Sequence, residues 1–584
     1  MSINIIGISA FYHNSACCLI QDGILKVAVE EERFTRKKND SRLPCNSFEF
    51  CLENSDLSIT DIDCIAYYED PLKKIERQKW SGYDINKLHH EMDPNRPINE
   101  IRKLLGYEGP IEIMNHHLSH AASSYYFSGF DEAAILTVDG VGEWATTTYG
   151  YGSNNKIDIF EEVIFPDSIG LFYATITSYL GFKVNSGEYK VMGLAPYGRP
   201  IYVNKIKKLI ILKDKGQFEL KMEYFDFIKG DCMFSNKLIE LLGQEPRIPE
   251  SEITQFHKDV ARSLQYVLEE IILLKVRYLF DRTKSKNLCM AGGVALNCVA
   301  NGRILKEGPF KKIFIQPGAT DSGCAIGAAA LAYTKLTNKK VEELKNVYLG
   351  PKYTSDKINR LLDATSLKYE NYQGKEEELI AQSAELIAKG KVIGWFQGKM
   401  EFGARALGAR SILADPRNNN MRDIINSMVK KREGFRPFAP AVLESKYKDH
   451  FDLQYPSPYM LFTCNVTSKL DLPAITHING SARVQTVNES DNPLFAKLIS
   501  KFDELTGCPI ILNTSFNVRG EPIVMSPIDA LKCFINTKID VLVISDFIIK
   551  REENSLTELK LAIKLFEKAA EITKVNNDSV YTFI

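Results

Sequence analysis

The feature that most constrains the fold is a strand–turn–strand pattern that occurs twice, about 130 residues apart. The first copy predicts strands at Asn4–Ser9, Ser15–Ile20 and Ile24–Glu30, with a turn at Asp22-Gly23. The second copy begins with the apolar run AAILTV at Ala133, turns at Asp139-Gly140 and returns over Ala145–Gly150. Two such patterns in one chain predict a duplicated α/β architecture.

Two later strands run directly into glycine-rich turns and then into helical patterns. Asn287–Met290 is followed by Ala291-Gly292-Gly293 and the helical pattern VALNCVANGRIL. Ile313–Ile315 is followed by QPGATDSG and a helix of small residues at Cys324–Tyr333. A glycine pair between strand and helix lets a ligand approach the backbone closely and meet helix N–H groups. Strands that alternate with helices predict a mainly buried, mixed or parallel sheet.

The composition of the chain changes over residues 335–375, which are polar and rich in Lys and Glu. At about 100–200 residues per domain, a chain of 584 residues predicts roughly two to four domains. We therefore place a boundary near residue 350 and expect domains over residues 1–350 and 351–584. Elements predicted for the second domain are a helix at Glu376–Lys389, strands at Val392–Phe396 and Pro509–Leu512, and a final helix at Glu553–Lys574.

The overall charge argues against two classes of partner. Lys and Arg number 73 against 74 Asp and Glu, a net charge of −1, which gives no general attraction to nucleic acid or to an anionic membrane. No apolar run approaches the roughly 20 residues that span a bilayer, and the N-terminus lacks a basic leader.

The 12 cysteines are scattered without a C-x-x-C pair, which favours reduced thiols of a cytoplasmic protein over disulfides or structural zinc.

Three of the nine histidines fall within five consecutive residues. On a helix, His116 and His120 would lie on one face, one turn apart, which suits two ligands of one metal; a partly buried structural pair is the alternative. Asp139 and Asp321 stand at comparable strand ends, and two histidines with two aspartates suit Fe(II), Mn(II) or Zn(II). Taken singly, Asp139 is more simply a turn residue and Asp321 a helix N-cap.

His13 lies at the tip of the first strand–turn–strand pattern, where such folds face their ligand. A neutral imidazole near pH 7 is well suited to take a proton from an acceptor hydroxyl. An ordinary turn residue is the alternative interpretation of His13.

The stretch from Lys399 to Arg436 is basic, with nine Lys or Arg against four Asp or Glu. Its charges are interleaved with glycine and aromatic residues in EFGARALGARS and KKREGFRPFAP. We therefore favour a pocket for phosphate or carboxylate over a solvated charged face, because arginine binds planar oxyanions through two hydrogen bonds. Later candidates for the same pocket are Arg483, Arg519 and, after a strand end, Asn513, Thr514 and Ser515.

Taken together, the motifs carry a resemblance that covers nearly the whole chain. From residue 7 to about 524 the chain contains, in order, GISAFYHNSA, HHLSHAASSYY, LTVDGVGEW, MAGGVALNCVANGR, PGATDSGCAIGAA, GKMEFGARALGARS, KKREGFRPFAPA, ARVQT and LNTSFNVRGEPIV. In this order they resemble the O-carbamoyltransferases of the NodU/CmcH type, which modify antibiotics, toxins and nodulation factors.

The resemblance implies two domains and a two-step reaction. The first domain is expected to be similar to the duplicated, actin-like ATPase fold of tRNA threonylcarbamoyl transferases, and the second to a YrdC-like α/β domain. In the family, carbamoyl phosphate and ATP give carbamoyl-adenylate and pyrophosphate in the second domain. The carbamoyl group then passes to a substrate hydroxyl beside a metal, iron, in the first. The expected activity is ATP-dependent O-carbamoylation; the alternatives are a tRNA-modifying threonylcarbamoyl-type transferase and a non-catalytic nucleotide-binding protein.

The resemblance also assigns roles to residues by position. The metal ligands fall on His116, His120, Asp139 and Asp321, and the general base falls on His13. The carbamoyl-phosphate site falls on Lys430, Met460, Arg483, Asn513, Ser515 and Arg519, with Lys430, Arg436 and Ser515 in catalytic roles. The nucleotide site falls on Gly292, Gly293, Asn297, Arg405 and Arg410.

The cofactors that the resemblance implies are ATP, Fe(II) as the divalent metal, and Mg²⁺ with the nucleotide. The expected partners are carbamoyl phosphate, ATP and a small-molecule alcohol, without nucleic acid or membrane. The acceptor stays open between a sugar, an antibiotic and a toxin, and a homodimer is the oligomeric state that the resemblance suggests.

Overall fold

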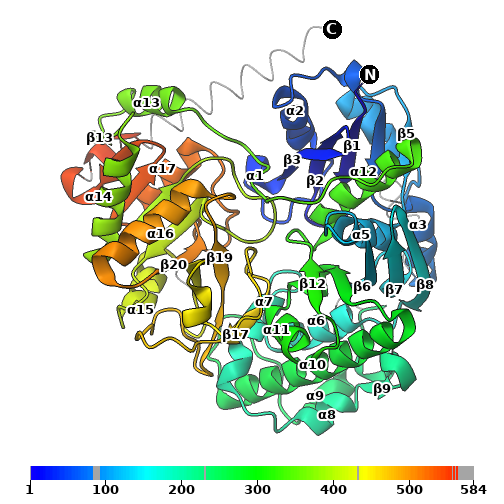
Figure 1. Cartoon of the computed structure of the whole chain (residues 1–584). Helices are drawn as coiled ribbons and strands as arrows, with labels where there is room; N and C mark the ends of the chain where they lie inside the picture. The colour runs from blue at the N-terminus through cyan, green and yellow to red at the C-terminus, as the bar shows by residue number, and fades with distance from the viewer. Residues whose placement is uncertain are drawn as a thin grey trace. The chain divides into compact units, whose positions relative to one another are not determined.

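The computed structural model describes residues 2–82, 92–228, 232–430, 433–555, 557–559 and 561–562, without the side chain of Lys430. The chain forms two compact units (Figure 1). Unit 1 comprises Met1–Val347 with Phe402–Ala404 and Leu461–Cys464, and unit 2 comprises Tyr348–Glu401, Arg405–Met460 and Asn465–Ile584. The main division lies close to the predicted boundary, but two short segments of the second half belong to unit 1, which a single boundary does not describe.

Unit 1 contains two five-stranded sheets with the same topology. Their strand orders are β3-β2-β1-β4-β5 and β12-β11-β6-β7-β8. In each sheet the first three strands along the chain are antiparallel neighbours, and the last two run parallel to the first. The first sheet consists of β1 (Asn4–Ser9), β2 (Ala16–Gln21), β3 (Ile24–Glu30), β4 (Cys64–Tyr67) and β5 (Ile111–Ile113). The second consists of β6 (Glu132–Val138), β7 (Ala145–Ser153), β8 (Lys156–Ile164), β11 (Asn287–Ala291) and β12 (Lys312–Ile315). The repeated topology confirms the duplicated α/β architecture expected of the actin-like class.

Two helices that carry site residues pack closely against each other in unit 1. They are α5 (His116–Tyr125) and α12 (Asp321–Thr337), and α12 also packs on β1 and β2. The approach requires glycine, because a Cβ on Gly327 of α12 would lie 1.8 Å from the carbonyl oxygen of Ser119 on α5. A Cβ on Gly7 of β1 would likewise lie 2.0 Å from the carbonyl oxygen of Ala325. Small residues thus bring the histidine helix against the helix that begins with Asp321.

The other helices of unit 1 complete its layers around the two sheets (Figure 1). They are α1 (Glu32–Thr35), α2 (Cys45–Glu53), α3 (Pro71–Trp80), α4 (Arg96–Glu100), α6 (Ile169–Tyr179), α7 (Glu188–Leu194), α8 (Val203–Lys207), α9 (Asn236–Leu242), α10 (Gln255–Thr283) and α11 (Cys298–Glu307). A two-stranded sheet of β9 (Ile210–Leu212) and β10 (Phe218–Leu220) lies in the same unit.

Unit 2 is built on a mixed sheet of order β13-β22-β21-β14-β15-β20-β16-β19. Its strands are β13 (Glu370–Asn371), β14 (Ile393–Phe396), β15 (Arg410–Ala414), β16 (Ala439–Leu443), β19 (Gln485–Val487), β20 (Ile510–Ser515), β21 (Val541–Ile544) and β22 (Phe547–Lys550). Its helices are α13 (Ser355–Asp363), α14 (Glu376–Ala388), α15 (Met421–Ile425), α16 (Pro493–Thr506) and α17 (Pro527–Asn536). A separate two-stranded sheet is formed by β17 (Thr463–Asn465) and β18 (Ser481–Arg483). The α/β class predicted for the second half is confirmed.

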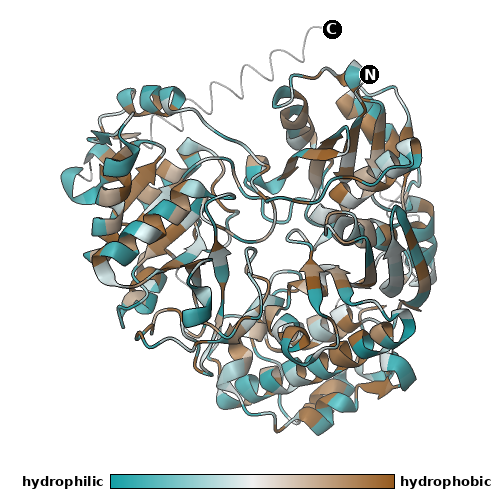
Figure 2. Cartoon of the chain, in the orientation of Figure 1, coloured by the Kyte–Doolittle hydropathy of each residue, from teal (hydrophilic) through white to brown (hydrophobic). Residues whose placement is uncertain are grey.

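Apolar residues follow the strands of both units, whereas peripheral helices such as α13 are largely polar (Figure 2). The strand β1, for example, is buried along its whole length. Among the helices that the structure describes, none is both long and apolar enough to cross a bilayer.

The final helix predicted at Glu553–Lys574 lies largely outside the described residues. The alternative that made Asp321 an N-cap is wrong, because Thr320 is the N-cap residue and Asp321 is the first residue of α12. Its carboxylate is therefore not engaged in capping the helix.

Candidate metal centre

Local hydrogen bonds fix the start of α5, which carries the two histidines. The side chain of the N-cap residue Asn115 accepts the N–H of Leu118, and the buried carboxylate of Glu143 accepts the N–H of His116 at 2.8 Å. Glu143 also accepts hydrogen bonds from the backbone N–H of Asp70 and the side-chain amide of Asn115. His116 and His120 follow at helical spacing on one face, as the sequence predicts.

The two aspartates approach the histidines from different elements. Asp139 directly follows β6, and its Oδ1 accepts the N–H of Gly293 at 2.9 Å. Its Oδ2 lies 3.3 Å from Nε2 of His116 and 3.5 Å from Nε2 of His120. Asp321, at the start of α12, places Oδ1 3.9 Å from each of the same two nitrogens. The structure therefore brings together all four residues that the sequence assigned to a metal.

Burial shows why this cluster calls for a cation. Donor atoms from the four residues lie within 4.8 Å of one another, and all four residues are buried. Asp321 is 0% exposed, and neither of its carboxylate oxygens has a hydrogen-bond partner in the described part of the chain. A buried carboxylate without partners costs several kcal/mol, roughly, unless a positive charge compensates it. Two imidazoles with two carboxylates form a donor set that fits a divalent transition metal.

The pKa shifts within the cluster also reflect its need for positive charge. Burial disfavours the charged form of His116, but the hydrogen bond to Asp139 and the charges of Asp321, Asp139 and Glu143 raise its pKa to about 9. Burial also acts against the charged form of Asp139, yet His116 and His120 hold the pKa of its carboxyl well below the usual value. Without a metal the cluster thus retains a proton to balance its carboxylates.

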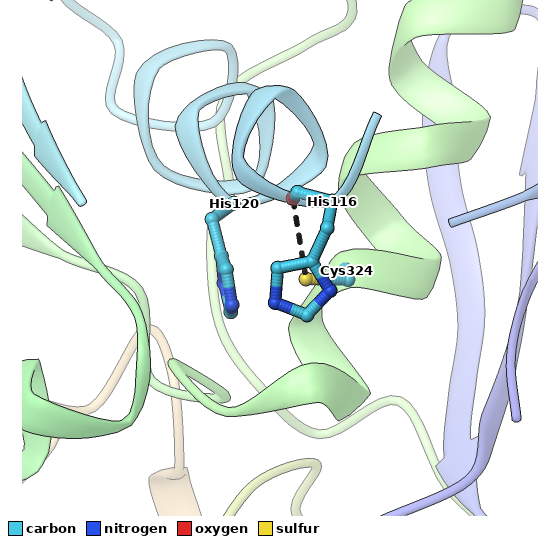
Figure 3. A group of neighbouring side chains, drawn as sticks. All are labelled: His116, His120 and Cys324. Carbon is cyan, nitrogen blue, oxygen red and sulfur yellow. Dashed lines mark hydrogen bonds between the residues drawn. The ribbon is translucent and has the colours of Figure 1, made fainter. Parts of the chain in front are cut away.

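A third kind of donor, which the sequence analysis missed, lies beside the histidines. Cys324 follows Asp321 by one turn of α12, and its Sγ lies 3.9 Å from the carbonyl oxygen of His116. Figure 3 shows this sulfur next to the two imidazoles that α5 presents. Sγ and one nitrogen from each of His116 and His120 lie within 4.8 Å of one another. The sequence signal for this donor was the position of Cys324 in the string PGATDSGCAIGAA, three residues after Asp321.

His13 lies close to the same cluster. Its Nδ1 is 4.0 Å from Oδ2 of Asp321 and 2.8 Å from the side-chain oxygen of Asn14. Because an amide oxygen can only accept, the contact with Asn14 places the proton on Nδ1 and leaves the lone pair on Nε2. Phe11 and Asn14 both have positive φ, so this loop adopts a backbone conformation that non-glycine residues rarely take.

The residues assigned to the nucleotide in unit 1 have structural partners. Gly292 has a φ of 94°, and a Cβ there would lie 2.2 Å from the carbonyl oxygen of Val138. Gly293 holds Asp139 through its N–H. The side chain of Asn297 caps α11 and exchanges two hydrogen bonds with Gln265. Their predicted contact with nucleotide stays a prediction.

In unit 2, a buried carboxylate organises the basic loop before β15. Oε1 of Glu401 accepts the N–H groups of Leu407, Ala409 and Arg410. Arg410 is fully buried, and its two Nη atoms donate to four backbone carbonyl oxygens. Burial lowers the pKa of this guanidinium to about 10. This placement does not support the predicted contact of Arg410 with nucleotide. Arg405 is half-buried, and its contact with nucleotide stays a prediction.

Two of the residues assigned to carbamoyl phosphate come together in unit 2. Arg436 and Arg519 both face the carboxylate of Glu433, at 3.8 and 3.9 Å, although 83 residues separate them in sequence. Ser515 ends β20 and donates to the side chain of Asn517. Other members of the predicted site are Arg483 at the end of β18, Asn513, which is buried and donates to Ala406 and Gln485, and Met460, which is buried with a positive φ. The side chain of Lys430 lies outside the described residues.

Unit 1 is thus a duplicated α/β unit with a buried donor set that could hold a cation, and unit 2 is an α/β unit in which two arginines face one carboxylate. The sequence comparisons make the class specific. Residues 4–94 and 98–330 match the family model "Carbamoyltransferase N-terminus", and residues 384–551 match "Carbamoyltransferase C-terminus". The chain belongs to the carbamoyltransferase family, and it is a carbamoyltransferase.

Named relatives are similar over most of their length. Nodulation protein NolNO of Sinorhizobium fredii is 39% identical, over 94% of this chain and 80% of that protein. Nodulation protein NolO of Bradyrhizobium diazoefficiens is 39% identical, over 76% of this chain and 80% of that protein. Among solved structures, full-length HypF in its phosphate- and nucleotide-bound form is 11% identical, covering 57% of this chain and 56% of that one, with a TM-score of 0.33.

Proposed function

We propose that the protein is an ATP-dependent O-carbamoyltransferase that activates carbamoyl phosphate in unit 2 and transfers the carbamoyl group to an alcohol in unit 1. Membership of the carbamoyltransferase family supports the transfer, and the two donor-rich sites support the division of labour. The observation that carries the metal-dependent step is Asp321, a fully buried carboxylate beside two imidazoles, whose two oxygens have no hydrogen-bond partner among the described residues. A cytoplasmic location is part of the same proposal.

The activation step needs positive charge around phosphates and little covalent chemistry from the protein. Carbamoyl phosphate and one water give carbamate and phosphate, and the carbamate oxygen then attacks the α-phosphorus of ATP, releasing pyrophosphate and forming carbamoyl-adenylate. Arg436 and Arg519 face the same carboxylate of Glu433, so their guanidinium groups are already directed toward one anionic position. Arginine stabilises the charge that develops on transferring phosphate oxygens by positioning and electrostatics. Lys430, Arg483 and Ser515 belong to the same proposed site.

The transfer step needs a base for the acceptor hydroxyl. With Nδ1 of His13 donating to Asn14, Nε2 is the atom that would take the hydroxyl proton. The acceptor oxygen then attacks the carbamoyl carbon, the bond to the adenylate oxygen breaks, and AMP leaves. Asp321 lies 4.0 Å from Nδ1 and would stabilise the imidazolium that forms. The proposed acceptor is a hydroxyl of a small-molecule natural product such as an antibiotic, a toxin or a sugar.

His116, His120, Asp139 and Asp321 would hold the metal, with Fe(II) as the proposed ion. When bound, a divalent ion supplies Lewis-acid stabilisation of oxygen atoms that gain negative charge during transfer. Its charge would also displace the proton that the cluster retains on His116. Mg²⁺ is proposed to accompany ATP.

The two steps can be separated by measuring pyrophosphate and carbamoylated product in parallel. With ATP and carbamoyl phosphate, we expect the protein to release pyrophosphate, and mass spectrometry of a panel of alcohols to find a product heavier by one carbamoyl group. His120→Ala is expected to abolish the product and retain pyrophosphate release, because only unit 1 has lost a ligand.

Arg519→Ala is expected to abolish carbamoyl-phosphate-dependent pyrophosphate release, and Arg360→Ala, an exposed arginine of α13, serves as its matched control. Equal loss of both steps in His120→Ala would contradict the division of labour. Pyrophosphate release that ignores carbamoyl phosphate would contradict the proposed donor.

A further inference from the structure

The histidine pair faces two chemically different sets of partners. One set consists of the carboxylates of Asp139 and Asp321. The other is the thiol of Cys324, which Figure 3 shows next to the two imidazoles. In the described part of the chain, the group formed by the thiol and the histidines does not include the carboxylates, so the two sets share only the imidazoles. Cys324 is 0% exposed, and its Sγ lies 3.9 Å from the carbonyl oxygen of His116.

We propose that Cys324 is a conditional metal ligand, which gives the centre a second donor set of two imidazoles and one thiolate that soft metal ions use. Asp321 and Cys324 are three residues apart on α12 and therefore occupy neighbouring positions on the face of that helix that meets α5. A small shift of an ion held by His116 and His120 would exchange carboxylate for sulfur ligation.

The preference between the two sets follows from ligand softness. Carboxylate oxygen suits Mn²⁺ and Mg²⁺, imidazole suits most first-row metals, and thiolate selects soft ions such as Cd²⁺ and, to a lesser degree, Zn²⁺. Binding of a soft ion through sulfur would replace the thiol proton with a metal–sulfur bond, and the proton would pass to the solvent. No electron is transferred in this exchange.

The structure also argues against treating Cys324 only as packing. Nδ1 of His116 and both ring nitrogens of His120 have no hydrogen-bond partner among the described residues. Imidazole nitrogens that are buried without hydrogen-bond partners are available to bind a metal ion. The consequence for the enzyme is that Cd²⁺ would occupy the histidines without requiring the carboxylates that the proposed reaction uses.

This inference rests on the metal centre of the proposed function, and binding spectroscopy without substrates tests it. The starting protein is the full chain, stripped of metal, with the exposed Cys232 replaced by serine. Titration with Cd²⁺ is expected to produce a near-ultraviolet sulfur-to-metal charge-transfer band. Cys324→Ser is expected to lose this band and to bind Cd²⁺ at least about tenfold more weakly, the lower limit typical for loss of groups around a metal.

Two further variants make the result specific. Cys51→Ser removes another fully buried thiol of unit 1, one that lies beside Cys17, and it is expected to retain the band. Asp321→Asn is expected to lose Mn²⁺ binding and keep the Cd²⁺ band. Retained Mn²⁺ binding by Cys324→Ser shows that this variant is folded.

The inference is overturned if the charge-transfer band is absent from the starting protein, if the band survives Cys324→Ser, or if it disappears with Cys51→Ser. The proposed function fails in a different way. In that case Mn²⁺ and Fe²⁺ do not bind to the starting protein at all, whatever the response to Cd²⁺.

Discussion

Replacing Asp321 with asparagine is expected to remove the stabilisation that the proposed metal would give to unit 1, without weakening the metal-free protein. Asparagine keeps the shape of the side chain and removes a negative charge that is fully buried and whose oxygens have no hydrogen-bond partner in the described structure. In the metal-free state this change loses an attraction to His116 across 3.9 Å and gains relief from burying a charge. We therefore expect a melting temperature equal to or above that of the metal-free wild type.

The metal-bound state gives the magnitude. An ion at about 100 times its Kd adds about 2.7 kcal/mol to the free energy of unfolding. Unit 1 has about 350 residues, and at about 2.1 cal/mol/K per residue its unfolding entropy is roughly 0.7 kcal/mol/K. Their quotient predicts that Mn²⁺ raises the melting temperature of unit 1 in the wild type by about 4 °C. The same concentration is expected to leave Asp321→Asn unchanged.

Differential scanning calorimetry of metal-stripped protein, with and without Mn²⁺, measures both effects. Asp158→Asn, which changes an exposed aspartate of β8, is the matched control and should retain the full increase. The electrostatic account would be refuted if the metal-free Asp321→Asn protein melted several degrees below the wild type. An undiminished increase with Mn²⁺ in that variant would remove Asp321 from the metal site.

The remaining predictions concern buried charges outside the donor set. Glu143→Gln is expected to weaken Mn²⁺ binding by about 10–100-fold, because the carboxylate that accepts the N–H of His116 positions a ligand; an unchanged titration would show that Glu143 only stabilises the fold. Lys275 is fully buried against Tyr149, and burial, opposed by the charge of Glu161, lowers the pKa of its ammonium to about 7. Below about pH 7 the buried ammonium therefore destabilises the folded state fully. From there up to the unfolded pKa of about 10.4, the free energy of unfolding of the wild type rises by up to about 1.4 kcal/mol per pH unit. Urea unfolding should show the stability difference between Lys275→Met and the wild type changing by roughly 2–3 kcal/mol between about pH 7.5 and 9.5, and a pH-independent difference would contradict the lowered pKa.

Much of the fold was predictable because its signals are local. The strands Asn4–Ser9 and Ile24–Glu30 occur as predicted, and the second strand of that pattern is displaced by one residue. Alternation and turn residues identify strands, and the repetition of the pattern indicates duplication. The strand order of each sheet was beyond such reasoning, since it depends on which edges pair after the helices have packed.

The candidate site was predictable where helical spacing or family position identified residues. His116 and His120 share a face of α5 because they are four residues apart, and the aspartates join them because both stand where a strand ends and a helix or turn begins. Glu143 and Cys324 were missed because each acts through tertiary contact with His116. The oxyanion pocket predicted from the basic stretch stays a prediction, and charge alone could not show that Arg410 is enclosed by backbone carbonyls.

The short segments of the second half that belong to unit 1 have a practical consequence for engineering. Gly403 donates to Glu30 and accepts from Arg33, and the carbonyl oxygen of Leu461 accepts from Asn301. A shortened protein ending at Val347 would leave these three polar side chains without the main-chain groups that satisfy them. In a chimera that takes its C-terminal half from a relative, the segments Phe402–Ala404 and Leu461–Cys464 would be replaced by those of the relative. The two halves of the chain are therefore poorly suited to being exchanged between relatives as independent domains.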